Sequence, residues 1–130
     1  MKNILVIEDD PITITLYKYI LKKAGYNLFI LEDGNEILSL LDDVEIHLII
    51  MDISLKNSYL NGQKMDGIKL SSFIKGNSKY VNIPIIIVTA YSAKIEGDEF
   101  FKKSFADDVL TKPIIDFNLF ISKIDRQIKN

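Results

Sequence analysis

The chain has 130 residues, no cysteine, and 16 basic and 18 acidic residues that give a formal net charge of -2. This length suits one compact domain, so a single domain over residues 1–130 is expected. The lack of cysteine excludes disulfides and thiolate metal ligands, and the balanced charge gives no support for binding to nucleic acid or to a membrane surface.

The first expected element is a short strand. The N-terminal sequence MKNILVIEDD contains one apolar run, Ile4 to Ile7, which acids follow at once. This run is too short for the core of a signal peptide, and no run in the chain reaches the length of a membrane span. A cytoplasmic protein with no membrane insertion is therefore expected. The run shows no polar alternation, which is typical of a parallel strand covered on both faces.

Strands and helices alternate along the rest of the chain. Apolar runs predict strands at residues 4–7, 48–51 and 85–88, and less apolar runs predict two more at 27–31 and 108–111. Helical patterns fall at residues 11–24, 34–42, 67–75, 95–104 and 116–129. Asp10 and Asp116 stand where helix caps are expected, and Gly25 stands where the first helix ends. Five strands that alternate with helices predict an α/β fold with a doubly wound parallel sheet, whose ligand site lies beyond the carboxyl ends of the strands.

The last two helices carry aromatic residues that are expected to pack inward. The final helix has one apolar face, made by Phe117, Phe120, Ile121, Ile124 and Ile128. The helix over 95–104 is expected to be packed by Phe100, Phe101 and Phe105.

Acidic residues follow two of the predicted strands at the edge where the ligand site is expected. Glu8, Asp9 and Asp10 follow the first strand, and Asp52 follows the run LIIM. If these strands are neighbours, their carboxylates converge and repel one another, and a bound cation offsets that repulsion. An all-oxygen site without His or Cys suits Mg²⁺ or Mn²⁺ better than zinc. Asp10 precedes a proline and is interpreted as a helix cap, so Glu8 and Asp9 remain candidate metal ligands beside Asp52.

Thr89 and Lys112 follow the last two predicted strands and bring a hydroxyl and an ammonium group to the same edge. A phosphoryl group on Asp52 would need such neighbours, because a cation and Lys112 neutralise charge on its oxygens and Thr89 donates a hydrogen bond. Taken singly, a threonine at a strand end is usually structural and a lysine is usually solvated. A phosphoryl site is indicated because the cation site, Asp52, Thr89 and Lys112 all fall at one edge of the predicted sheet.

Four stretches of the sequence resemble the receiver domain of bacterial response regulators, in order and with roughly the expected spacing. They are ILVIEDDP, LIIMDIS, PIIIVTA and ADDVLTKPI, and the resemblance extends over essentially all 130 residues. It implies a flavodoxin-like sheet of five parallel strands in the order 2-1-3-4-5. It also implies a place in a two-component pathway or phosphorelay, with a histidine kinase or a histidine phosphotransfer protein as phosphoryl donor and an unidentified protein as target.

The resemblance assigns roles to the residues of the acidic cluster. Asp52 would accept the phosphoryl group from a partner's phosphohistidine. Asp9 would bind Mg²⁺ directly, and Glu8 would act beside it or through water. The backbone carbonyl of Ser54 would supply another oxygen ligand. Acting on itself, the domain would catalyse only its own phosphorylation and dephosphorylation, so it is not expected to be an enzyme for an external substrate.

The resemblance also assigns roles to the last two strand ends. Thr89 would move toward the phosphoryl group and report its presence, and Lys112 would contact it directly. The peptide bond between Lys112 and Pro113 would be cis. The resemblance also implies a monomer or a weak dimer.

An insertion separates this chain from the usual family pattern. Family members usually have a proline four residues after the phosphoacceptor and a glycine eight residues after it. Here Lys56 stands at the first place, and Asp66-Gly67 arrives fifteen residues after Asp52. The segment 53–67 is interpreted as a partner-docking loop, as a partial lid or as a tolerated surface insertion.

Two further departures from the family pattern concern how the domain would pass its signal to a target. Val109 stands where the family often has a tyrosine or phenylalanine that moves with the threonine, and Tyr91 is the candidate substitute. The sequence ends at Asn130 without an output module, so an effect through non-covalent association is expected unless the sequence is a piece of a longer chain.

Three other functions fit the sequence less well. A receiver-like adaptor that signals without phosphorylation has no physical need for the intact set of site residues. A Mg²⁺-dependent phosphohydrolase commonly has a second acid two residues after its nucleophile, where this chain has Ser54. A flavin-binding protein needs a phosphate-cradling loop after the first strand, where this chain has carboxylates that would repel a phosphate.

Overall fold

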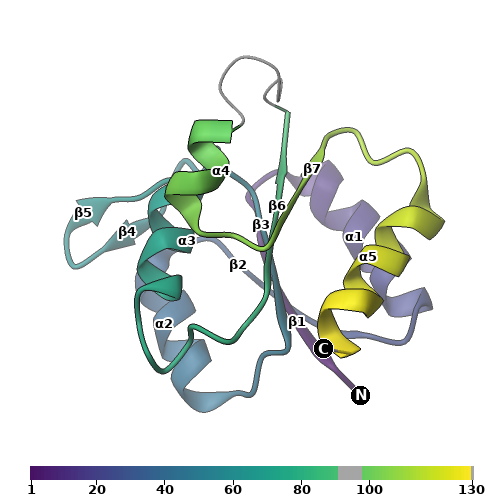
Figure 1. Cartoon of the computed structure of the whole chain (residues 1–130), viewed down its shortest axis with the longest axis horizontal. Helices are drawn as coiled ribbons and strands as arrows, with labels where there is room; N and C mark the ends of the chain where they lie inside the picture. The colour runs from purple at the N-terminus through teal and green to yellow at the C-terminus, as the bar shows by residue number, and fades with distance from the viewer. Residues whose placement is uncertain (91–97, 130) are drawn as a thin grey trace.

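Five parallel strands form the central sheet in the order β2-β1-β3-β6-β7 (Figure 1). They are β1 (Asn3–Ile7), β2 (Asn27–Leu31), β3 (Leu48–Met51), β6 (Ile85–Thr89) and β7 (Asp108–Thr111). The computed structural model describes residues 1–90 and 98–129. Counted along the chain, the strands of this sheet stand in the order 2-1-3-4-5, so the fold class predicted from the sequence is confirmed.

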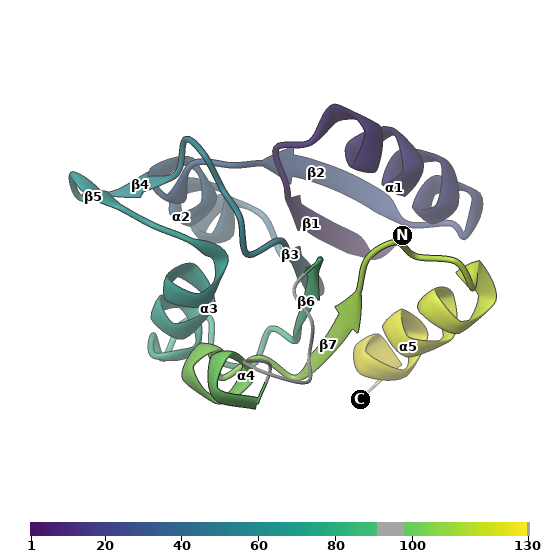
Figure 2. The same ribbon diagram turned by 90° about the horizontal axis from the view of Figure 1, so that it is seen from above.

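Helices cover both faces of the sheet, as Figures 1 and 2 show. One face carries α1 (Pro11–Lys23) and α5 (Phe117–Lys129), and the other carries α2 (Gly34–Asp43), α3 (Gly67–Lys75) and α4 (Asp98–Ser104). Successive strand residues point to opposite faces. In β1, Ile4 and Val6 pack in the core on the α1 and α5 side, whereas Leu5 and Ile7 pack in the core on the α2 and α3 side. Both faces are buried, which explains why the strand sequences show no polar alternation.

The expected caps fix the ends of two helices. The Asp10 side chain accepts a hydrogen bond from Thr13 N at 2.9 Å at the start of α1, and the Asp116 side chain accepts one from Leu119 N at 2.9 Å at the start of α5. Gly25 follows α1 with a φ of 93°, a conformation that a residue with a Cβ rarely adopts. None of the helices in residues 1–90 and 98–129 is long and apolar enough to cross a membrane.

Two aromatic side chains that were expected to pack inward are exposed. Phe105 is 66% exposed, because α4 ends at Ser104 and the next residue leaves the helix with a φ of 56°. Phe117 is 41% exposed, because it stands in the first turn of α5, at the end of its apolar face. The middle of that face is buried as expected, and Phe120 packs against Tyr17 of α1 with ring centroids 5.9 Å apart.

The insertion after β3 contains a two-stranded hairpin. Strands β4 (Tyr59–Leu60) and β5 (Gln63–Lys64) pair antiparallel around Asn61 and Gly62, which both have positive φ. The hairpin extends outward beside α2 and α3, away from the centre of the sheet edge (Figures 1 and 2). Leu60 is buried in the core on the α2 and α3 side. The insertion is therefore an ordered part of the fold, and its hairpin does not lie across the acidic cluster.

Candidate functional site

The pairing of β1 with β3 brings the first acids together. Ile7 and Met51 are register partners at the carboxyl ends of these strands, so Glu8 and Asp52 follow them at neighbouring places. The backbone N–H of Asp52 continues the ladder by donating to the Ile7 carbonyl at 3.0 Å. Glu8 and Asp52 are buried, with 3% and 7% of their surface exposed. The sheet itself thus places two carboxylates at one edge.

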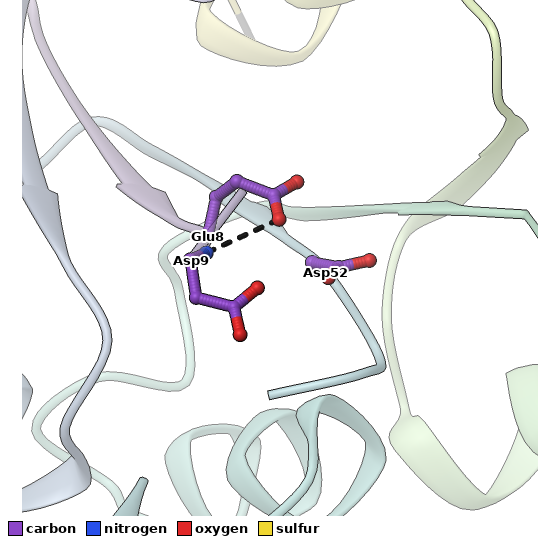
Figure 3. Close-up of side chains that lie close together, drawn as sticks. All are labelled: Glu8, Asp9 and Asp52. Carbon is purple, nitrogen blue, oxygen red and sulfur yellow. Dashed lines mark hydrogen bonds between the residues drawn. The ribbon is translucent and has the colours of Figure 1, made fainter. Parts of the chain in front are cut away.

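Glu8, Asp9 and Asp52 form one cluster (Figure 3). Each offers a carboxylate oxygen, and these oxygens lie within 4.8 Å of one another. The dashed line in Figure 3 marks the bond by which the backbone N–H of Asp9 donates to Glu8 Oε2 at 3.1 Å. The N–H of Asp10 donates to the same oxygen at 3.2 Å. The local turn after β1 therefore orients the buried Glu8 carboxylate.

Lys112 brings a positive charge to this cluster. Its Nζ donates to Glu8 Oε1 at 2.7 Å and to Asp52 Oδ1 at 3.3 Å. Lys112 is the residue after β7, the edge strand, and its backbone N–H donates to the Thr89 carbonyl at 2.8 Å. One ammonium group therefore bridges two buried carboxylates that arrive from the ends of β1 and β3.

The electrostatics of the cluster favour added positive charge. Burial, and then the negative charge of Glu8, raises the pKa of the Asp52 carboxyl from 3.8 to about 6, although Lys112 acts in the opposite direction. Burial lowers the pKa of Lys112, but its bond to Glu8 and the charges of Asp52 and Glu8 outweigh this and raise it overall, so Lys112 stays protonated. Within residues 1–90 and 98–129, one ammonium group bonds to this cluster, and it does not balance the three carboxyl groups.

The side chains present fit a divalent cation. All three donors are carboxylate oxygens within reach of one another, and such ligands suit Mg²⁺ and Mn²⁺. Burial, which removes the carboxylate from water, is the main cause of the raised pKa of Asp52, and the Lys112 ammonium group does not fully compensate for it. A divalent cation would supply that missing compensation, so this acidic cluster can bind Mg²⁺.

The other predicted site residues lie at the same edge. Thr89 ends β6 and is 6% exposed, and the bond between Lys112 and Pro113 is cis, as expected from the sequence. Ser54 is exposed two residues after Asp52, and the role of its carbonyl stays a prediction. Val109 is 37% exposed on β7.

Tyr91 lies outside the described residues, so its assignment as the substitute for the missing aromatic residue stays a prediction.

A glycine allows the insertion to return beside Asp52. Gly67, the first residue of α3, donates its N–H to the Ile53 carbonyl at 2.9 Å. A Cβ at Gly67 would lie 2.0 Å from the backbone oxygen of Asp52. This close approach explains why a glycine opens the third helix even though the insertion has moved it further along the chain.

Sequence reasoning missed the residues that hold the insertion in place. Glu32 Oε2 accepts from the backbone N–H groups of Lys56 and Asn57, and Asp33 Oδ1 accepts from that of Tyr59. The available signal was the pair of acids directly after β2, whose carboxyl end lies at the same sheet edge as the cluster. Neither acid was singled out, because neither belongs to a motif of the family.

The fold and the site together define a class of protein. A sheet of order 2-1-3-4-5 with an acidic cluster, a threonine and a lysine at its carboxyl edge is that of a signalling receiver domain. Residues 4–125 match the family model described as response regulator receiver domain. The chain therefore belongs to the response regulator receiver domain family.

Individual relatives agree with this assignment. The chain is 27% identical over 114 residues to the polar-differentiation response regulator DivK of Brucella anthropi, covering 87% of this chain and 85% of DivK. It is 32% identical over 117 residues to the alkaline phosphatase synthesis transcriptional regulatory protein PhoP of Bacillus subtilis, covering 86% of this chain but only 42% of PhoP. The structure matches the signal receiver domain of a histidine kinase from Syntrophus aciditrophicus with a TM-score of 0.84 and 28% identity, covering 99% of this chain and 91% of that one.

Membership of the family carries general properties. Receiver domains of response regulators are in general not enzymes in the ordinary sense, and they interact with histidine kinases and with downstream targets. They generally bind Mg²⁺, and the acidic cluster of Glu8, Asp9 and Asp52 is present in this chain.

The raised pKa of Asp52 predicts a pH-dependent stability. The folded protein binds the Asp52 proton more tightly than the unfolded chain, so this group's contribution is fully present below pH 3.8 and is lost as pH rises through about 6. Two pKa units correspond to about 3 kcal/mol, and solvent screening at this open edge reduces the expected effect to about 1–2 kcal/mol. Without Mg²⁺, Asp52→Asn should therefore be more stable than the wild-type protein at pH 7.5.

Urea unfolding in the presence of EDTA, at pH 7.5 and again near pH 4, measures this difference. The gap between Asp52→Asn and the wild-type protein should shrink at the lower pH, because the wild-type carboxyl is then largely protonated in the folded state. A gap that is the same at both pH values would contradict the assignment of the effect to Asp52.

Proposed function

We propose that Asp52 accepts a phosphoryl group from a phosphohistidine of a partner histidine kinase or histidine phosphotransfer protein, in a Mg²⁺-dependent reaction. The phosphorylated chain then signals by associating with a downstream protein. The observation that carries the proposal is the bridge from Lys112 Nζ to Glu8 and Asp52, which sets a cation against a buried carboxylate at the ligand edge of the sheet.

The proposed transfer is a displacement at phosphorus. An oxygen of the Asp52 carboxylate forms a bond to phosphorus, the phosphorus–nitrogen bond of the donor breaks, and its electron pair stays on the imidazole, which takes up a proton. Lys112 is placed to neutralise charge on the phosphoryl oxygens, because its Nζ already lies 3.3 Å from Asp52 Oδ1. The Thr89 hydroxyl would donate a hydrogen bond to an oxygen of the same phosphoryl group.

Hydrolysis of the acyl phosphate makes the signal transient. Water attacks the phosphorus of the acyl phosphate, the bond to the Asp52 oxygen breaks, and inorganic phosphate leaves with the carboxylate restored. This self-dephosphorylation is part of the proposal, as is the restriction of the chemistry to the domain's own Asp52.

Mg²⁺, or Mn²⁺ in its place, would be held by Glu8, Asp9 and Asp52 and by the carbonyl of Ser54. When bound, the cation would neutralise negative charge on the transferring phosphoryl group. The chain's own contribution is the arrangement of oxygens described above, in which Glu8 is fixed by the N–H groups of Asp9 and Asp10.

The proposal also covers the setting of the domain. Residues 1–130 would act as a single receiver domain in the cytoplasm, as a monomer or weak dimer, without binding nucleic acid. Most of that length, residues 4–125, falls within the matched family model.

Intact-mass measurement tests the proposed chemistry. The purified protein is incubated with acetyl phosphate and Mg²⁺, and the expected result is a gain of one phosphoryl group. Asp52→Asn and a wild-type sample with EDTA should show no gain. If folded wild-type protein gains no phosphoryl group from acetyl phosphate or from a phosphorylated histidine kinase, the proposal fails and the phosphorylation-independent adaptor becomes the better interpretation.

A further inference from the structure

Three side chains of the segment after β2 hold the backbone of the insertion. Glu32, Asp33 and Asn35 accept hydrogen bonds from four backbone N–H groups between β3 and β5. These are Lys56 N at 3.1 Å and Asn57 N at 2.8 Å to Glu32, Tyr59 N at 2.8 Å to Asp33, and Asn61 N at 3.2 Å to Asn35. Asp33 precedes α2 at the capping position, but it makes no side-chain cap bond there. Its carboxylate binds the insertion instead.

The first of these contacts reaches the candidate metal site. The N–H of Lys56 donates both to Glu32 Oε2, at 3.1 Å, and to Asp9 Oδ2, at 3.3 Å. Asp9 thus has one carboxylate oxygen held by the insertion. The N–H of Lys56 exists only because this chain has a lysine where family members usually have a proline, which has no N–H.

We propose that Glu32 is a positioning residue for Asp9. By accepting from two successive N–H groups, Lys56 N and Asn57 N, Glu32 fixes the start of the insertion so that Lys56 N–H restrains the Asp9 carboxylate at the cluster. The inference rests on the proposed function, because it concerns the Mg²⁺ ligands of that site.

The physical basis is the orientation of a ligand before the cation arrives. Asp9 is only half-buried, and a free aspartate side chain would lose rotational freedom when it binds a cation. A carboxylate that is already held by an N–H loses less rotational freedom when it binds a cation. Partners that orient metal ligands typically change metal affinity by about 10–100-fold. The bond from Lys56 to Asp9 is long, at 3.3 Å, so we expect an effect near the lower end of that range.

Binding of Mg²⁺ by isothermal titration calorimetry tests the proposal. We expect Glu32→Ala to weaken Mg²⁺ binding about tenfold. Glu32→Gln removes the charge but keeps an oxygen that accepts from both N–H groups, so it should weaken binding by no more than about threefold. Lys56→Pro removes the N–H that Asp9 and Glu32 share, together with the lysine side chain and some backbone freedom, and it should weaken binding as much as Glu32→Ala does.

Asn35→Ala is the matched control. It removes a contact of the same kind at the far end of the insertion, from Asn61 N, and this contact does not involve Asp9. A purely structural role for these contacts would make Glu32→Ala and Asn35→Ala alike in stability and leave Mg²⁺ affinity unchanged in both. Hydrogen exchange of the Lys56 and Asn57 amides, measured without Mg²⁺, should show protection in the wild-type protein and its loss in Glu32→Ala.

The outcomes separate this inference from the proposed function. If Glu32→Ala and Lys56→Pro bind Mg²⁺ with unchanged affinity while the wild-type protein is phosphorylated on Asp52, the positioning role alone is overturned. Equal weakening in Glu32→Gln and Glu32→Ala assigns the effect to charge and also overturns it. A wild-type protein that binds no Mg²⁺ and accepts no phosphoryl group overturns both. Because Lys56→Pro leaves Glu32 in place, the test does not depend on one variant folding.

Discussion

Gly67→Ala is expected to destabilise the protein by at least about 3 kcal/mol and to remove most of its phosphorylation. The added Cβ would lie 2.0 Å from the backbone oxygen of Asp52 and 2.8 Å from the Cα of Ile53. Both are backbone atoms, so no side-chain rotation relieves the clash. The start of α3 must move away from the end of β3, and the bond from Gly67 N to the Ile53 carbonyl is lost or stretched.

The loss of phosphorylation follows from the place of this clash. Asp52 is the proposed nucleophile, and a shift of about 1 Å in a reacting group can cost about 100-fold in rate. Urea unfolding gives the stability, and the rate of mass gain with acetyl phosphate at low temperature gives the activity of the folded fraction. Gly67→Ala with the stability and rate of the wild-type protein would show that α3 does not approach Asp52 in this way.

Gly62→Ala is the matched control for this variant. Gly62 has a φ of 82°, but a Cβ there would meet nothing within 4 Å. Alanine at this position therefore bears only the cost of its backbone conformation, about 1–2 kcal/mol. Gly62 lies at the tip of the hairpin, away from the carboxylates, so the phosphorylation rate should stay at the wild-type value. Comparison of the two variants separates the clash at Asp52 from the general cost of replacing a glycine.

The parts of the fold that sequence predicted are those set by local patterns. The apolar run from Ile4 to Ile7 needs burial on both faces, and a parallel sheet covered by helices satisfies that need. Asp10 and Asp116 act on N–H groups three residues away, which makes their capping readable from the sequence. The convergence of Glu8 and Asp52 was predicted on the condition that their strands are neighbours, and the pairing of β1 with β3 meets that condition.

The insertion was harder to predict because its structure depends on distant segments. Its hairpin has two residues in each strand, too few to show alternation, and the sequence Asn61-Gly62 was the one local signal for its turn. Its attachment uses side chains of Glu32, Asp33 and Asn35, which lie about two dozen residues earlier in the chain. No periodicity records such contacts between a side chain and a remote backbone group.

The contact of Lys56 with Asp9 changes how the departure from the family pattern is understood. In sequence, the lysine at this place was one of the two signs of an insertion, because family members usually have a proline there. In the structure, its backbone N–H donates to a candidate metal ligand. The same substitution that removes the restricted backbone of a proline adds a donor at the rim of the site.

Lys112→Ala should separate the stability of the site from its chemistry. The variant leaves Glu8, which is 3% exposed, and Asp52 without their cation. Breaking a buried ion pair from one side costs about 3–5 kcal/mol, and because 21% of the Lys112 side chain is exposed we expect about 2–3 kcal/mol without Mg²⁺. Added Mg²⁺ should restore much of this stability, because it binds the same carboxylates and no longer competes with the ammonium group.

Phosphorylation should not recover in the same way. Lys112 is proposed to neutralise charge on the phosphoryl oxygens during transfer, and the loss of one such group typically costs about 100- to 1000-fold in rate. Thermal unfolding with and without Mg²⁺, together with the rate of mass gain from acetyl phosphate at saturating Mg²⁺, measures the two effects in one set of samples. Lys112→Arg keeps the charge and should retain more stability than Lys112→Ala.

Lys123→Ala supplies the comparison for Lys112→Ala. Lys123 pairs with Asp108 at 3.2 Å, but both side chains are about a quarter exposed, and such pairs contribute less than about 1 kcal/mol. It should therefore change neither the response to Mg²⁺ nor the phosphorylation rate. If Lys112→Ala behaves like Lys123→Ala, the bridge to Glu8 and Asp52 carries neither the stability nor the reaction. If Mg²⁺ restores the stability of Lys112→Ala while phosphoryl transfer stays slow, then any cation at the carboxylates stabilises the fold. Phosphoryl transfer, in contrast, needs Lys112 in particular.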